Sequence, residues 1–164
     1  FACPLSLGQE SECECVDVKT EAEALDFAQW QTELNTIMPA GIHITHVGPV
    51  KMKADLIAYA CYRITYPAGA ETALDGYNAL ETAPVEKHGK KGNKIIDIKE
   101  NNPHIEYTAE GDSVSFDLCL PASQQLNLNP SLLTGFLEEK FGLPAANAAI
   151  LRKEFLTADK QKFE

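Results

Sequence analysis

Four lysines lie within eight residues of this chain, at Lys87, Lys90, Lys91 and Lys94, with two glycines between them. They form the one basic cluster of an acidic sequence whose formal net charge is −10. Ammonium groups gathered on a glycine-containing turn bring positive charge and free backbone donors toward a phosphate, and such contacts bind without reading base sequence. A solvated surface turn has the same composition, so both interpretations stay open.

The two arginines, Arg63 and Arg152, each fall inside an apolar, strand-like run. A guanidinium in such a run needs a carboxylate or phosphate partner, and structural pairing is the commoner outcome. Asp97, between Ile96 and Ile98, is a candidate internal partner for one of them. We add Arg152 to the lysines as a candidate RNA- or phosphate-binding residue, with a structural ion pair as the alternative.

The five cysteines are odd in number and lack the paired spacings of zinc sites: Cys3, Cys13, Cys15, Cys61 and Cys119. We predict free thiols in a reducing cytoplasm. Two residues apart in a strand, Cys13 and Cys15 would share a face, as a metal-binding pair requires. Small buried or half-buried side chains are the favoured alternative, so we predict no metal site and no cofactor.

The tripeptide Glu10-Ser11-Glu12 offers two acids and a hydroxyl. A serine nucleophile needs a positioned base, and no histidine stands in a local motif with Ser11. We therefore expect these residues to cap a turn, and the sequence assigns no catalytic residue.

Charge is unevenly distributed: residues 1–82 carry 12 acids and 4 bases, whereas residues 83–111 carry five of each. This asymmetry argues against nucleic-acid binding over the whole surface and leaves a local patch. No apolar run of about 18 residues could span a membrane, and no signal peptide is visible. We predict a cytoplasmic protein without a membrane partner. Because the first residue is Phe1 rather than Met, we read the sequence as a fragment of a longer protein.

The elements that must position these residues follow from the spacing of apolar side chains. In the first half, alternation predicts strands at residues 13–19, 42–50, 58–66 and 85–88. A capping box at Thr20–Glu23 starts a helix that ends before Pro39, and a second helix spans Ala73–Leu80. The order βαββαβ is that of a ferredoxin-like split βαβ domain.

The second half predicts strands at residues 95–99, 104–109, 114–120 and 149–156, with a helix that starts at Asn129-Pro130 and ends at Gly142. We therefore expect an α+β chain: a ferredoxin-like half at 1–88, a second β-rich α+β half at 89–157 packed on it, and a frayed tail at 158–164. The basic stretch Lys87–Lys94 is predicted to form a hairpin, and it is the seam between the halves.

Several blocks, in order along the chain, resemble the radical SAM-linked protein family, a bacterial domain of unknown function. Residues 1–12 are similar to its "F-x-P-P-L-P-x-G-x-E-S-E" stretch, and residues 34–42 to its "L-N-x-x-L-P-x-G-I". The basic turn before Ile96-Asp97-Ile98 is similar to a basic-then-Asp strand, and Asn129-Pro130 and Ile150-Leu151-Arg152 to its closing blocks. Where the family has Ala and an aromatic residue, this chain has Cys13 and Cys15.

The resemblance implies a context more than a mechanism. Such domains are fused to, or encoded beside, B12-binding radical SAM proteins, often near a ribonuclease G gene, and the family's N-terminal segment precedes the first block seen here. We therefore expect a non-catalytic accessory domain that binds RNA or an RNA-protein substrate for a radical SAM partner. An enzyme domain whose active site the N-terminal segment completes is the alternative.

Overall fold

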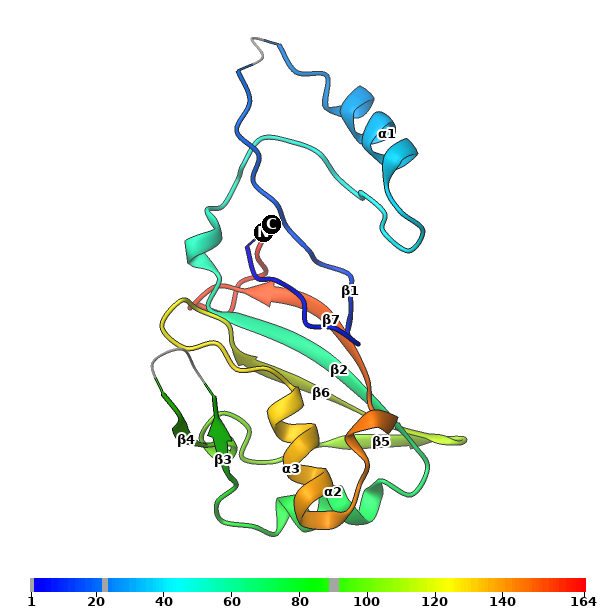
Figure 1. The fold of residues 1–164 in the computed structure, drawn as a ribbon, viewed down its shortest axis with the longest axis vertical. Coiled ribbons are helices and arrows are strands. Elements are labelled where there is room, and N and C mark those ends of the chain that lie inside the picture. Colours follow the sequence, from blue (N-terminus) through cyan, green and yellow to red (C-terminus); the bar gives the residue numbers. More distant parts are fainter. Residues whose placement is uncertain (1, 22–23, 89–91) are drawn as a thin grey trace.

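The computed structural model describes residues 2–21, 24–88 and 92–164, and it has a mixed α+β fold built on a five-stranded sheet (Figure 1). The strand order is β1-β7-β2-β6-β5. The strands of this sheet are β1 (Glu10–Ser11), β2 (Tyr59–Pro67), β5 (Tyr107–Glu110), β6 (Ser113–Pro121) and β7 (Ala149–Leu156). The predicted α+β class is confirmed.

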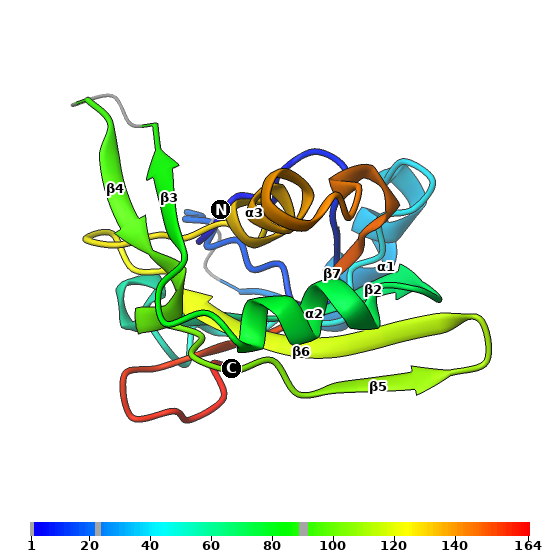
Figure 2. The same cartoon turned by 90° about the horizontal axis from the view of Figure 1, so that it is seen from below.

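A separate two-stranded hairpin is formed by β3 (Pro84–Lys87) and β4 (Lys94–Asp97). Two helices, α2 (Glu71–Asn78) and α3 (Ser131–Phe141), lie together on one face of the large sheet (Figure 2). The helix α1 (Phe27–Ile37) stands at the far end of the molecule (Figure 1). Short 3-10 turns occur at Ala54–Leu56, Ile98–Glu100 and Ala145–Asn147.

The ferredoxin-like order is present, but at other residues than predicted. The succession β2-α2-β5-β6-α3-β7 reads βαββαβ, and these strands lie in the order β7-β2-β6-β5 with every neighbouring pair antiparallel. It therefore spans residues 59–156, and the β3–β4 hairpin is inserted between α2 and β5. Because β2 pairs with β6 and β7, the two predicted halves contribute strands to one sheet.

The placement of the ferredoxin-like unit within residues 13–88 is wrong. Neither residues 13–19 nor residues 42–50 form a strand, and 85–88 falls largely in the separate hairpin. Alternation of apolar and polar residues indicates an extended chain, but a strand also needs a neighbour. Among the described strands, the neighbour available to the N-terminal stretch is β7, and β1 pairs with it, in parallel, over two residues alone.

The core lies between the large sheet and the two helices. The largest fully buried side chains include Ile64 and Tyr66 of β2, Leu74 and Tyr77 of α2, and Leu137 of α3. The Tyr77 ring meets Phe136 edge-on, with centroids 6.2 Å apart. This packing follows the two periodicities of the sequence, since alternate residues of a strand and every third or fourth residue of a helix face the same layer.

Cys61 and Cys119 form a disulfide on the face of the sheet opposite the helices. They are 58 residues apart in sequence but lie directly opposite each other in β2 and β6. The predicted free thiols are therefore wrong for this pair, because parity and spacing of cysteines do not reveal which strands meet. Cys3, Cys13 and Cys15 are free.

Residues 158–164, expected to be a frayed tail, fold back along β7. The backbone N–H of Phe163 donates to the carbonyl of Phe155 at 2.9 Å, and Leu156 bridges Lys162. The Phe163 side chain packs against the core, which accounts for the return of the chain. Within the described residues, no helix is both long and apolar enough to cross a membrane.

Candidate functional site

The β3–β4 hairpin places its two described lysines directly opposite each other. The antiparallel register pairs Lys87 with Lys94 and Val85 with Ile96. Because side chains alternate along a strand, all four share one face. Val85 and Ile96 pack against the core, so the lysines continue this inner face of the hairpin toward its tip.

Lys87 is tethered to the body of the molecule. Its Nζ donates to the backbone carbonyl of Asn127 at 2.5 Å, in the loop that leads into α3. The side-chain amide of Asn127 in turn donates to Sγ of Cys3 at 3.8 Å. One bond uses one of the ammonium donors and leaves others for a ligand. The positive charge of Lys87 is thus fixed in position without being neutralised.

Lys94 is exposed, and the ion pairs within the described part of the chain include neither it nor Lys87. Like charges directly opposite each other in an antiparallel pair are destabilising. Lys90 and Lys91 lie outside the described residues. An anion bound between Lys87 and Lys94 would relieve their repulsion, which makes the inner face of the hairpin the candidate site.

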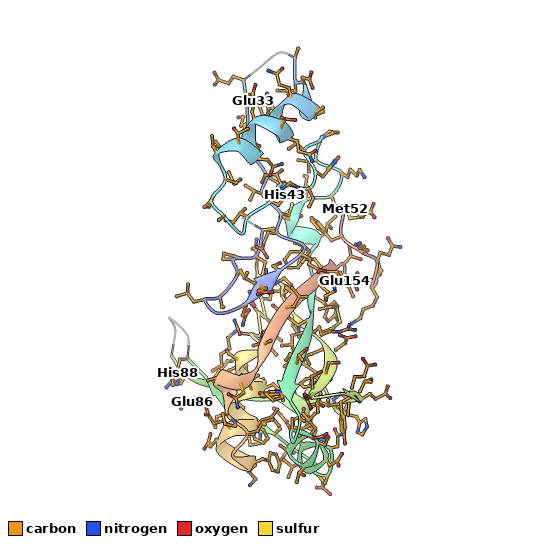
Figure 3. The ribbon with its side chains drawn as sticks, turned by 90° about the vertical axis from the view of Figure 1, so that its right-hand side faces the viewer. Glu33, His43, Met52, Glu86, His88 and Glu154 are labelled. Atoms are coloured by element: carbon orange, nitrogen blue, oxygen red, sulfur yellow. A yellow bond between two sulfur atoms is a disulfide. The ribbon has the colours of Figure 1, made fainter. Side chains whose placement is uncertain are left out.

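The outer face of the hairpin has a different character. It carries Glu86 and the 79%-exposed Ile95, and Figure 3 labels Glu86 and His88 along it. Near the tip, Nδ1 of His88 lies 2.9 Å from Oδ1 of Asn93. Because an amide oxygen only accepts, Nδ1 carries the hydrogen, and this bond closes the hairpin from strand to strand.

The base of the hairpin is closed by Asp97. Its Oδ1 accepts from the backbone N–H of Ala83 at 2.8 Å and from that of Lys99 at 3.0 Å, and Ile98 N–H donates to the Ala83 carbonyl at 3.0 Å. The hairpin therefore begins and ends at one point of the body. The expectation that Asp97 pairs with an arginine is wrong, since its carboxylate is used by these backbone donors.

Arg152 lies in β7, where it is 2% exposed. Its Nη1 donates to the carbonyl of Cys3 at 2.8 Å and to the carboxylate of Glu14 at 2.7 Å, and its guanidinium lies 5.0 Å from the Phe155 ring. The structural ion pair named above as the alternative is thus the arrangement present. Arg152 holds the N-terminal stretch on the sheet. Successive hydrogen bonds from Lys87 to Asn127, from Asn127 to Cys3 and from Arg152 to Cys3 link this stretch to the hairpin.

The free thiols around Arg152 have the character of packed side chains. Burial raises the pKa of Cys13 to about 11, although a hydrogen bond with Ser11 and the charge of Arg152 oppose that rise. Burial also raises the pKa of Cys15. Thiols of this kind are protonated at neutral pH and are poor nucleophiles. In the described ranges, no group of three or more His, Cys, Asp or Glu side chains is placed to hold a metal ion.

A shallow groove of about 370 Å³ lies on the open face of the sheet. Arg63 forms a two-pronged bond with Asp117 there, with both N···O distances at 2.9 Å, and this bond lowers the pKa of Asp117. The groove is also lined by His104, Glu106, Thr108, Ser115 and Phe116. Because the guanidinium is already paired and Glu106 adds negative charge, the groove does not favour a phosphate.

The sequence profile of a family described as "Uncharacterized protein conserved in bacteria (DUF2344)" matches residues 1–130. The chain belongs to this family. The matched residues include β1, α1, the hairpin and the loop with Asn127, whereas Arg152 lies beyond them. No curated protein and no solved structure matches the chain significantly.

Sequence reasoning missed two features of the candidate site. Asn127 carried no signal of its own, because its contribution to Lys87 is a backbone carbonyl. The hairpin at Lys87–Lys94 was predicted, but its register, which places Lys87 directly opposite Lys94, was not.

Proposed function

We propose that this DUF2344 domain is a non-catalytic accessory domain that binds RNA, or the RNA part of an RNA-protein substrate, through the inner face of its β3–β4 hairpin. The observation that carries the proposal is the direct opposition of Lys87 and Lys94, neither of which forms an ion pair with a described carboxylate. In the proposed complex a phosphate of the RNA backbone lies between the two ammonium groups.

The kind of binding follows from the chemistry of the hairpin. Lysines supply charge to phosphates without reading bases. Sequence-specific RNA recognition commonly stacks bases on aromatic side chains. Apart from the imidazole of His88, the described hairpin residues 84–88 and 92–97 contain no aromatic ring. We therefore propose binding that depends on charge and shape, with a strong dependence on salt.

The partner part of the proposal rests on the resemblance to radical SAM-linked proteins described from the sequence. In it, the domain holds the RNA while a radical SAM enzyme acts on it. The alternative, an active site completed elsewhere in a longer chain, would be favoured by a deep pocket with Glu10, Glu12, Asp97 or Arg152. The described groove on the open face of the sheet is lined by none of these four residues.

Fluorescence anisotropy with a pool of structured RNAs tests the proposal, at low and at high salt, using the protein and a variant with Lys87, Lys90, Lys91 and Lys94 changed to Ala. Removal of one lysine–phosphate ion pair should reduce the slope of log K against log salt by about 1. A matched variant changes four exposed lysines elsewhere: Lys19, Lys53, Lys140 and Lys162.

Salt-sensitive binding that the hairpin variant loses and the matched variant keeps would support RNA binding by the hairpin. Equal losses in the two variants would assign the binding to overall charge and contradict a hairpin site. Absence of binding at low salt would overturn the RNA proposal and leave the hairpin as a solvated turn.

A further inference from the structure

Residues 16–56, which we call the arm, have no core of their own. Among the arm residues that the structure describes, 16–21 and 24–56, none is buried. Apolar side chains are nevertheless frequent there, and six are largely exposed: Val16, Val18, Ile37, Ile42, Val50 and Leu56. In Figures 1 and 3, α1 of the arm stands well apart from the five-stranded sheet. The arm thus presents apolar surface that the domain does not cover.

The helix of the arm is held in place mainly by hydrogen bonds. The side-chain amide of Asn35 both accepts from the backbone N–H of Ile44 at 2.8 Å and donates to its carbonyl at 3.0 Å, and Gln31 donates to the carbonyl of Thr45 at 3.1 Å. These bonds attach the following segment to one side of α1. They explain how an 11-residue helix keeps its place without a buried side chain.

The neighbouring side of α1 is apolar. Phe27, Trp30, Leu34 and Ile37 follow one another at intervals of three and four residues, so they form one stripe. The first three are half-buried and Ile37 is 73% exposed. A helix of this length is marginal in water, and most helical stability in proteins comes from burial of such a stripe. A partner that covers the stripe would supply that burial.

Charge decides what kind of partner fits. Within residues 16–38 one basic residue, Lys19, stands against five acidic ones: Asp17, Glu21, Glu23, Asp26 and Glu33. A second copy of the arm would bring like charges together, and RNA would be repelled. We propose that the arm is a docking surface for a protein whose contact region presents apolar side chains bordered by lysine or arginine. This inference is independent of the RNA proposal, because it rests on the acidic, apolar arm and the RNA proposal rests on the lysines of the hairpin.

Two designed 18-residue helical peptides with identical leucine faces test the inference, one with lysine and one with glutamate on the polar face. Both are labelled, and their binding to the protein is measured by fluorescence anisotropy. We expect binding of the lysine peptide only, weakened about fivefold by Ile37→Ser because the leucine face then buries less apolar surface. Ile95→Ser on the hairpin is the matched control, since Ile95 is 79% and Ile37 73% exposed.

A second variant, Glu21→Lys combined with Glu33→Lys, tests the role of charge. It should weaken binding of the lysine peptide, while an unchanged circular dichroism spectrum shows that the fold is kept. Binding of neither peptide overturns the inference. Equal binding to the protein and to Ile37→Ser also overturns it, since that assigns the contact to acidic surface elsewhere. If sedimentation shows a dimer of the protein and a monomer of Ile37→Ser, the stripe binds a second copy of the chain. That result would overturn the proposal of a basic partner.

Discussion

The guanidinium of Arg152 and the carboxylate of Glu14 meet at 2.7 Å although 138 residues separate them in sequence. The arginine side chain is 3% exposed and the glutamate side chain 30%. Together with the bond to the Cys3 carbonyl, this pair fixes the N-terminal stretch against β7. Among the ion pairs of the described residues, this is the one with a buried partner, because the other paired side chains are at least 40% exposed.

Loss of Arg152 should therefore be costly. Arg152→Ala leaves Glu14 and the Cys3 carbonyl without their donor, and we expect it to lower the free energy of unfolding by about 3 kcal/mol. Urea denaturation measures the change. The neighbouring surface pair Lys153–Glu12, with side chains 40% and 54% exposed, is the control, and Lys153→Ala should cost less than about 1 kcal/mol. Equal effects of the two variants would show that Arg152 is not an anchor.

The disulfide predicts a thiol count. Of the five cysteines, Cys61 and Cys119 are joined and three are free, so the denatured protein should show three reactive thiols before reduction and five after it. Closing a loop of this length stabilises by about 2–4 kcal/mol, so reduction should lower the urea midpoint. Five thiols without reductant would contradict the pairing.

Cys13 should react slowly at neutral pH. Burial raises the pKa of its thiol to about 11 from an ordinary value of 9.0, so the neutral thiol is favoured in the folded state. Only the thiolate is nucleophilic, and two pKa units reduce its fraction at pH 8 by about 100-fold. Iodoacetamide labelling localised by tandem mass spectrometry should therefore accelerate up to about pH 11. A rate at Cys13 that levels off near pH 9 would refute the shift.

The two helices on the sheet touch at Gly76. A Cβ built there would lie 2.6 Å from a ring carbon of Phe141, whereas at Gly135 in α3 it would meet nothing within 4 Å. Gly76→Ala should lower the free energy of unfolding by about 1 kcal/mol or more, because crowding outweighs the better helix propensity of alanine. Gly135→Ala should raise it by about 0.5–1 kcal/mol. Thermal melts of both variants test the contrast, and stabilisation by Gly76→Ala would show that Phe141 moves aside.

The accuracy of the sequence predictions depended on how local each signal was. β6 and β7 alternate clearly, and the helix after Asn129-Pro130 carries its own start signal, with the Asn129 side chain accepting from Ser131 N–H at 2.9 Å. These elements were predicted close to their observed bounds. The start of α1 was not, because Asp26 caps it by accepting from Gln29 N–H, and this position is later than the predicted box at Thr20–Glu23.

Pairing between distant strands was the part that the sequence could not supply. The alternation of residues 13–19 did not indicate that β1, and not these residues, pairs with β7. The spacing of the cysteines likewise did not indicate that Cys61 lies opposite Cys119. The candidate site shows the same limit. Composition located the four lysines, but the inner face of the hairpin and the tether of Lys87 to Asn127 depend on packing between separate parts of the chain.

Because Ala83 and Ile98 are hydrogen-bonded to each other, β3 leaves the body of the domain and β4 returns to it at the same point. The hairpin lies in the connection between α2 and β5, and neither of its strands pairs with a strand of the large sheet. The hairpin is thus an insertion that is structurally separable from the sheet. A short loop grafted between Ala83 and Ile98 should therefore give a folded domain that lacks the positively charged hairpin.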